Sequence, residues 1–249
     1  MRQFFFRPTQ IKLAEKFFGN QVKMNELLKG YKQFRDKYFQ NPDNTLYKDL
    51  VVNGQQPPIM VIGCSDSRVD LSYIFNCPPG TFFTVRNVAN LVPPCNNDLK
   101  HHGTSAAIEH GVKTLKVKHI IVFGHSHCGG IRHLLTSKTP SPLSETSFMS
   151  SWMDIAREAK NKVLEKHKDQ PLDHQAKICE EQSIIISLNN LKTFKWVMDK
   201  VSLGMLTLHG WRLDLDTGII QQYNPSSNQF EDLPIEMPEN IFSPSLHLR

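Results

Sequence analysis

The sequence predicts an α/β fold in which a central, mostly parallel β-sheet is flanked by helices. Four compact apolar runs, at residues 59–63, 82–85, 119–124 and 205–209, lack strict alternation and are typical of strands buried on both faces. Helical patterns lie between these runs. Because alternating strands and helices favour parallel pairing, we expect functional side chains just beyond the carboxyl ends of the strands.

An amphipathic helical arm is predicted to precede the sheet. Over residues 8–40, apolar side chains recur at three- and four-residue spacing among Lys, Glu and Arg. Residues 1–45 are therefore predicted to form an N-terminal helical arm. The apolar run at residues 4–6 lies between Arg2 and Arg7 and is shorter than the roughly 7–15 residues of a signal-peptide core. We therefore expect no export signal and a cytoplasmic location.

Further helices and a final hairpin complete the predicted domain. Helical patterns cover residues 104–115, a stretch from about residue 130, and residues 144–167 and 173–200. Residues 213–223 predict a hairpin with Gly218 in its turn, and therefore an antiparallel edge strand. The α/β domain is thus predicted at residues 46–223. The Pro-, Ser- and Asn-rich residues 224–249 are predicted to form a C-terminal tail.

Composition and charge exclude several classes of protein. Of the 249 residues, 39% are hydrophobic and 21% charged, as in ordinary globular domains. The 29 basic and 24 acidic residues are scattered, so the net charge of +5 indicates a solvated surface and no nucleic-acid partner. The apolar runs fall far short of the roughly 20 residues of a membrane-spanning helix, so no membrane partner is expected. Five cysteines at irregular spacing favour thiols or metal ligands over disulfides.

Two of the predicted strands are followed by residues of the types that bind metals. Cys64 and Asp66 follow the first strand, and His125 and Cys128 follow the third. Parallel pairing would bring these four side chains to one end of the sheet, and zinc accepts thiolate, imidazole and carboxylate ligands. The two pairs are far apart in the sequence, unlike the short knuckles of a zinc finger. The fold itself must therefore assemble the site.

In these motifs the chain resembles the β-class carbonic anhydrases, and in particular their plant-like pocket subgroup. Four motifs carry the likeness: CSDSR at 64–68, FTVRNVANLVPP at 83–94, GTSAAIE at 103–109 and HSHCGGI at 125–131. The resemblance implies that Cys64, His125 and Cys128 are the permanent ligands of a zinc ion whose fourth position holds water. The implied reaction is the reversible hydration of CO2 to bicarbonate and a proton, a lyase activity.

The resemblance also implies catalytic roles for Asp66 and Arg68. Zinc lowers the pKa of bound water to about 7 in a carbonic anhydrase with three histidine ligands. Beside two thiolates we expect less acidification and a pH optimum above neutrality. Asp66 is expected to accept a hydrogen bond from the zinc-bound hydroxide that attacks CO2. Arg68 is expected to keep Asp66 ionised, paired and away from the metal.

A substrate pocket follows from the same resemblance. Gln55 is expected to donate a hydrogen bond to a substrate oxygen, Phe83 and Val88 to form an apolar wall, and the Gly129 N–H to be a second donor. His110 stands where relatives usually carry Tyr. Because the family shares pocket residues across a two-fold interface, some of these side chains are expected to face a partner's zinc. We therefore expect a homodimer or a higher homo-oligomer.

Several alternatives remain open on the sequence alone. Residues 124–128 copy the G-x-S-x-G pattern of serine hydrolases, with Ser126 as nucleophile, except that Cys128 replaces the last Gly. A related zinc hydrolase acting on CS2 or COS would share every ligand, and a non-catalytic zinc-binding protein would have its fourth metal position closed. His127 is interpreted as a solvent-facing loop side chain or a proton relay. The remaining candidates are interpreted as a core histidine, His209, and as buried or partly buried thiols, Cys77, Cys95 and Cys179.

Overall fold

The computed structural model describes residues 24–96, 98, 100–137 and 148–234. The chain divides into two compact units, Met1–Gln55 and Gln56–Arg249. This boundary lies ten residues beyond the predicted end of the arm at residue 45, so the short helix that follows the arm belongs to the first unit. In the described residues no helix is both long and apolar enough to cross a membrane.

Over residues 24–55, the described part of the first unit, the chain forms two helices, α2 (Met24–Tyr38) and α3 (Leu46–Asn53). Part of the predicted arm, residues 1–23, lies outside the described residues. Aromatic rings join the two helices, since the Tyr47 ring lies 5.3 Å from that of Phe34 and 5.0 Å from that of Phe39. Other large apolar side chains of this unit are exposed: Leu27, Leu28, Tyr31, Val51 and Val52.

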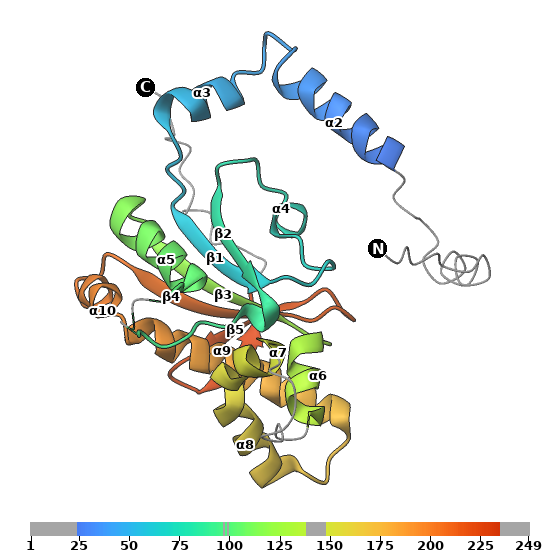
Figure 1. The fold of residues 1–249 in the computed structure, drawn as a ribbon, viewed down its shortest axis with the longest axis vertical. Coiled ribbons are helices and arrows are strands. Elements are labelled where there is room, and N and C mark those ends of the chain that lie inside the picture. The colour runs from blue at the N-terminus through green and yellow to red at the C-terminus, as the bar shows by residue number, and fades with distance from the viewer. Residues whose placement is uncertain (1–23, 97, 99, 138–147, 235–249) are drawn as a thin grey trace, which may run out of the picture. The chain divides into compact units, whose positions relative to one another are not determined.

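A six-stranded sheet forms the centre of the second unit, with the order β2-β1-β3-β4-β5-β6 (Figure 1). The parallel strands are β1 (Ile59–Cys64), β2 (Phe82–Asn87), β3 (His119–His125) and β4 (Thr207–Leu213). Two antiparallel strands, β5 (Ile220–Asn224) and β6 (Gln229–Asp232), complete the sheet. The predicted fold class is therefore confirmed, including the antiparallel edge.

The prediction that a tail begins at residue 224 was wrong, because strand β6 lies inside the predicted tail. Tyr223 and Asn228 explain the hairpin: Asn228 has a positive φ of 54°, and its side chain accepts a hydrogen bond of 2.8 Å from the Tyr223 hydroxyl. This turn reverses the chain, so that Gln229 pairs with Asn224. The strand is largely polar and gave no apolar pattern to recognise. Residues 235–249 of the predicted tail lie outside the described residues.

Helices and short helical turns cover the sheet. In chain order they are α4 (Leu71–Ile74), η1 (Val88–Asn90), α5 (Gly103–Glu109), η2 (His110–Thr114), α6 (Gly129–Thr136), α7 (Phe148–Met153), η3 (Asp154–Ala156), α8 (Arg157–His167), α9 (Leu172–Lys192) and α10 (Lys195–Ser202). Helix α9 packs on β3 and β4, and α6 and α8 pack on α9 (Figure 1). The helix predicted over 173–200 is interrupted because Phe194 has an extended backbone and a buried ring.

Both faces of the central strands are buried, which explains why their sequences do not alternate. Residues of β1 and β3 divide between two apolar clusters. Met60, Ile62, Ile120 and Val122 belong to one cluster, and Val61, Ile121 and Phe123 belong to the other. Since successive side chains of a strand point to opposite faces, an unbroken apolar run is what a strand between two packed layers requires.

Gly124 in β3 leaves room for a side chain of α9 to pack against the sheet. A Cβ atom on Gly124 would lie 2.7 Å from Ile184 Cδ1 and 3.1 Å from Ile184 Cγ1, and Ile184 is fully buried. We expect Gly124→Ala to lower the free energy of unfolding by about 1–3 kcal/mol, because the added methyl overpacks the core. Urea denaturation of the metal-free protein measures this loss.

Gly103 provides the matched control, because a Cβ there would meet no atom within 4 Å and its φ is not positive. Gly103→Ala should therefore leave the denaturation midpoint almost unchanged. Equal midpoints for Gly124→Ala and Gly103→Ala would show that α9 can shift away from β3 at little cost.

Candidate metal centre

Neighbouring parallel strands bring three buried metal-ligand side chains together. Cys64 is the last residue of β1, His125 is the last residue of the adjacent β3, and Cys128 directly precedes α6. The ligand atoms of these three residues all lie within 4.8 Å of one another. The structure thus gathers the three ligands that the resemblance implied.

His125 shows that this cluster fits a metal ion. Its Nδ1 lies 2.8 Å from the carbonyl oxygen of Ser126, so Nδ1 carries the ring proton and Nε2 has a free lone pair. Nε2 is buried and has no hydrogen-bond partner among the described residues. A buried polar atom left unpaired costs about 1–3 kcal/mol. A zinc ion between one imidazole and two thiolates would satisfy it.

The two thiols of the cluster are coupled to each other by a hydrogen bond. A hydrogen bond from Cys128, which outweighs the opposing effect of burial, lowers the pKa of Cys64 to about 4. The same hydrogen bond and burial both raise the pKa of Cys128. The pair therefore favours the thiolate form at Cys64, and the thiolate is the form in which a cysteine binds a metal.

Asp66 and Arg68 form the expected ion pair beside the cluster. Arg68 Nε and Nη2 donate to the two Asp66 carboxylate oxygens at 2.9 and 2.8 Å. This bidentate contact with Arg68 holds the pKa of Asp66 well below its usual range. Asp66 Oδ2 lies 3.9 Å from His125 Nε2, so the carboxylate borders the metal cluster while remaining paired with Arg68.

Arg86 also belongs to the site, although no role was predicted for it from the sequence. From β2 it donates to the carbonyl oxygens of Cys64, at 2.9 Å, and Asp66, at 2.6 Å. It therefore holds the backbone between the predicted ligand and the predicted catalytic carboxylate. Arg86 lies in the FTVRNVANLVPP motif, and this could have marked it as a site residue. Its hydrogen bonds to carbonyl groups after a neighbouring strand could not be predicted from sequence spacing.

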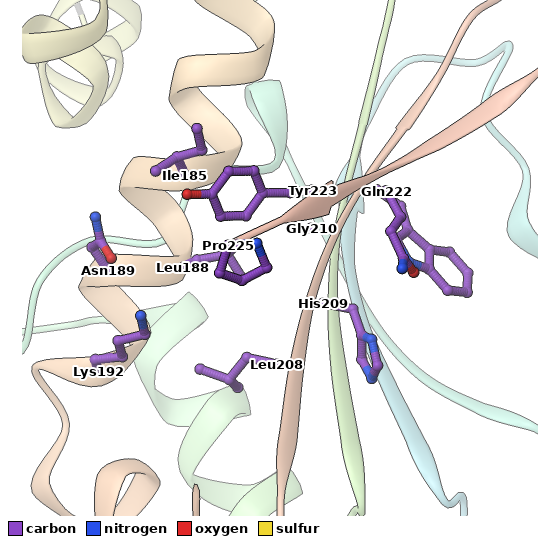
Figure 2. Close-up of a pocket in the computed structure, with 11 residues that line it drawn as sticks. Ile185, Leu188, Asn189, Lys192, Leu208, His209, Gly210, Gln222, Tyr223 and Pro225 are labelled. Carbon is purple, nitrogen blue, oxygen red and sulfur yellow. The ribbon is translucent and has the colours of Figure 1, made fainter. Parts of the chain in front are cut away.

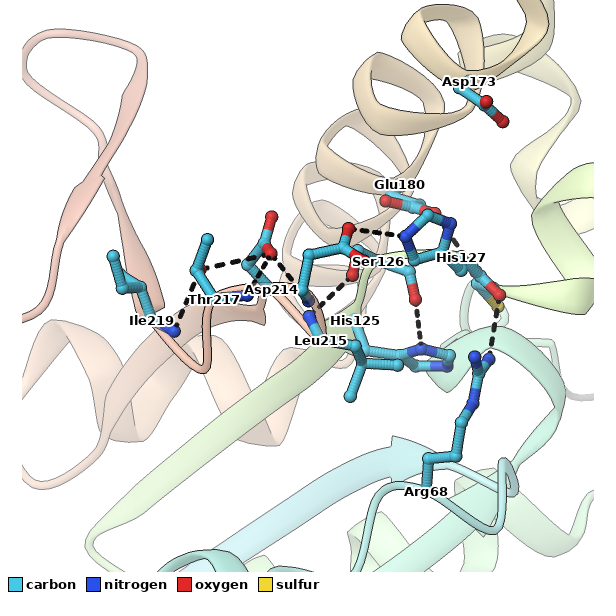
Figure 3. A network of polar contacts seen from close by, with 12 residues as sticks. Arg68, His125, Ser126, His127, Asp173, Glu180, Asp214, Leu215, Thr217 and Ile219 are labelled. Carbon is cyan, nitrogen blue, oxygen red and sulfur yellow. Dashed lines mark hydrogen bonds and ion pairs between the residues drawn. The ribbon is translucent and has the colours of Figure 1, made fainter.

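The loop between His125 and Cys128 is anchored to the turn after β4 (Figure 3). The Ser126 N–H donates to the Leu213 carbonyl at 2.8 Å, and the Ser126 hydroxyl oxygen accepts from the Leu215 N–H at 2.7 Å. His127 Nε2 lies 2.6 Å from Asp216 Oδ2. Ser126 is buried and holds this turn in place, an arrangement that does not favour a serine nucleophile. His127 is exposed, as the solvent-facing interpretation expects.

Two further bonds hold the same loop from other elements. Arg68 Nη2 donates to the His127 carbonyl oxygen at 3.1 Å. The Cys128 N–H donates to Glu180 Oε1 of α9 at 3.1 Å, and Glu180 pairs with Arg212 of β4. Glu180, Arg212 and Asp216 belong to no recognised motif, so no sequence pattern connects them with the metal ligands.

The predicted substrate residues fall into three groups. Val88 and Gly129 lie near the ligands: Val88 packs on the cluster that includes Cys64 and Cys128, and Gly129 follows Cys128. The rings of Phe83 and His110 lie 5.6 Å apart, and Phe83 packs on the apolar cluster around Met60. Gln55 belongs to the first unit. The roles of Gln55, Phe83 and His110 at a partner's zinc stay predictions.

The remaining predicted structural residues are placed outside the metal cluster. His209 Nε2 lies 3.1 Å from His119 Nδ1, and burial lowers the pKa of His209, as expected of a core histidine. Cys179 is buried, which raises the pKa of its thiol to about 12, and Cys77 is partly buried. The prediction for Cys95 was wrong: it is exposed, in the loop before α5.

A pocket of about 280 Å³ lies away from the metal cluster, between α9 and strands β4 and β5 (Figure 2). Its lining includes Leu188 and Asn189 of α9 and Leu208 of β4, and none of the three predicted ligands. This pocket therefore does not mark the predicted metal site, which is identified by the ligand atoms of Cys64, His125 and Cys128.

Comparison with known proteins agrees with this site. The family model for carbonic anhydrases matches residues 59–220. The β carbonic anhydrase 3 of Arabidopsis thaliana is 35% identical over 206 residues, which cover 82% of this chain and 78% of that protein. The mitochondrial β carbonic anhydrase 6 of the same plant is 37% identical over 195 residues, which cover 78% of this chain and 65% of that protein.

Solved structures are similar over most of the chain. The β-carbonic anhydrase CcaA is 30% identical with a TM-score of 0.74, and the match covers 84% of this chain and 99% of that one. A Coccomyxa β-carbonic anhydrase is 28% identical with a TM-score of 0.67, over 81% of this chain and 86% of that one. On the evidence of the family model, the relatives and the buried Cys-His-Cys cluster, this chain belongs to the β-class carbonic anhydrases.

Proposed function

We propose that Cys64, His125 and Cys128 hold the zinc ion with which this enzyme catalyses the reversible hydration of CO2 to bicarbonate and a proton. Membership of the family makes the chain a zinc-dependent carbonic anhydrase. One observation supports the ligand assignment above the others: His125 Nε2 is buried without a hydrogen-bond partner in the described structure, within 4.8 Å of two thiol sulfurs.

The mechanism divides between the metal and the residues around it. Zinc, when bound, supplies Lewis acidity that makes water a nucleophile near neutral pH. Asp66 accepts a hydrogen bond from the attacking water or hydroxide at a carboxylate oxygen, and so orients the attacking oxygen toward CO2. Arg68 donates to both oxygens of Asp66, which keeps the carboxylate ionised and directs it away from the ligands.

Substrate binding is proposed to use the groups next to Cys128. Gly129 begins α6, where a backbone N–H without a partner within the helix can donate to the developing bicarbonate. Val88 packs on the apolar cluster that includes both thiols, and an apolar surface there suits CO2, a substrate without charge. No observation on the described residues favours CS2 or COS as substrate or a non-catalytic zinc protein.

Stopped-flow CO2 hydration, with metal analysis on the same sample, tests this function. We expect close to one zinc per chain and a rate that falls when a chelator removes the metal and returns when zinc is added. Zinc binding without CO2 hydration would overturn the proposed reaction. Faster hydrolysis of CS2 or COS than hydration of CO2 would favour the related hydrolase.

We propose further that the protein is a homo-oligomer, at least a dimer, in which the arm takes part. Exposed apolar side chains on α2 and α3 support this, because such groups mark interaction surfaces. A similar solved structure comes from Sordaria macrospora, two of whose β-carbonic anhydrases are described as tetrameric. It is 26% identical to this chain, with a TM-score of 0.64.

Removal of residues 1–40 should weaken this assembly. The truncation deletes α2 and its exposed apolar side chains, so we expect fewer subunits per particle in light scattering and a shift of the assembly midpoint to higher protein concentration. Removal of residues 235–249 serves as a control of similar kind at the other terminus. A truncated protein with the parent number of subunits and full activity would contradict a role for the arm.

The location is proposed to be cytoplasmic. One similar plant protein is named mitochondrial, so the test must separate the two compartments. Cell fractionation with the chain tagged at its C-terminus should recover it with cytosolic markers, and recovery with mitochondrial markers would contradict the proposal.

A further inference from the structure

A buried carboxylate lies directly behind the predicted ligand Cys128. Glu180, on α9, is 3% exposed, and its Oε1 accepts the Cys128 N–H at 3.1 Å. Its other oxygen accepts from Arg212 Nε at 3.2 Å and Nη2 at 3.0 Å. Arg212, on β4, is 2% exposed and also lies 3.4 Å from Asp214. Two elements far from the motif thus support the metal loop.

The Cys128 N–H has a special position in this loop. It lies after the end of β3 and before the first residue of α6, so neither the strand ladder nor the helix supplies an acceptor for it. The orientation of this peptide sets where the Cys128 sulfur lies relative to Cys64 and His125. Glu180 therefore controls a backbone group that a metal ligand depends on.

Stability alone does not account for the buried pair. Replacing a buried ion pair by apolar side chains of similar volume is often neutral or stabilising, since desolvation of two charges offsets their attraction. An apolar pair at 180 and 212 could fill the space equally well. What it could not do is accept the hydrogen bond from Cys128.

We infer that Glu180, held in place by Arg212, is a positioning residue for the zinc ligand Cys128. The carboxylate fixes the peptide of Cys128 so that its sulfur meets Cys64 and His125 in a geometry ready for the metal. This inference rests on the proposed zinc site and extends it to a carboxylate that does not touch the metal. Partners of this kind typically alter metal affinity by about 10–100-fold when removed.

Two double variants separate the hydrogen bond from the ion pair. Glu180→Gln with Arg212→Met removes both charges but keeps an oxygen acceptor for the Cys128 N–H. Glu180→Leu with Arg212→Met removes both charges and the acceptor. Asp173→Asn, which breaks the exposed ion pair between Arg132 of α6 and α9, controls for charge loss nearby. Zinc affinity by chelator competition and the visible spectrum of the cobalt-loaded protein are the readouts.

We expect the Gln/Met variant and Asp173→Asn to bind zinc within a few-fold of the parent, and the Leu/Met variant about 10–100-fold more weakly with an altered cobalt spectrum. Urea denaturation of the metal-free proteins shows whether each is folded. Equal affinity in the two double variants would overturn the inference. If the Leu/Met variant does not fold, weak zinc binding by a folded Gln/Met variant overturns it instead. A parent protein that binds no zinc would contradict the proposed function itself.

Discussion

Cys64→Ser is expected to yield a folded protein without zinc and without measurable CO2 hydration. A serine hydroxyl stays protonated at neutral pH, whereas the pKa of Cys64 is lowered to about 4 by its hydrogen bond with Cys128. The variant thus replaces the most acidic ligand of the cluster by a neutral one. We expect zinc affinity to fall by more than the roughly 10–100-fold that changes outside the ligand set produce. Cys128→Ser should behave alike.

Zinc content, measured after dialysis against a weak chelator, checks this result. Cys77→Ser is the matched control, because this thiol is only partly buried and donates to the Phe75 carbonyl at 3.2 Å, away from the cluster. It should retain zinc and activity. Full zinc occupancy in either ligand variant would contradict the assignment of the site.

Asp66→Asn is expected to keep zinc and lose most of the activity. The carboxylate borders the cluster but is not one of its three donors, so metal affinity should change little. An amide can present an N–H where the carboxylate only accepts, and it also leaves Arg68 without its ionic partner. Groups that move or orient a proton in a transition state typically contribute about 10²–10⁴-fold to rate, and we expect a loss of kcat in this range.

Asp70→Asn is a close control for this experiment. Asp70 lies four residues later and accepts the Tyr73 N–H at 3.0 Å as the N-cap of α4, a role that Asn fills equally well. Its activity should equal that of the parent. An Asp66→Asn enzyme with unchanged turnover and unchanged zinc would mean that the Asp66–Arg68 pair is structural.

The sequence predicted those parts of the molecule that depend on local patterns. Apolar runs without alternation predicted the parallel strands, because each of these strands packs on both faces. The four motifs predicted the ligands and the Asp66–Arg68 pair. In contrast, β6 is a polar strand whose existence depends on pairing with β5, and the break at Phe194 depends on a buried ring.

The supporting residues of the site could not be predicted in the same way. Glu180 and Arg212 are ordinary charged residues within a long helix and a strand, and their burial together is a product of tertiary packing. Arg86 lies in a recognised motif, yet its bonds to the loop after β1 follow from the sheet order. The residues expected to face a partner's zinc depend on a second chain, so neither the sequence nor a single chain tests them.

The anchoring of the metal loop has a consequence for the order of events as the protein is made. The loop at residues 125–128 is held by α9 and by Asp216 in the turn after β4, so its supports are among the last parts of the domain to be synthesised. A nascent chain that carries all three ligands still lacks Arg212 and Asp216. Zinc should therefore be captured late, by a domain whose strands have already paired. We therefore expect zinc to bind after the domain has folded and not to nucleate its folding.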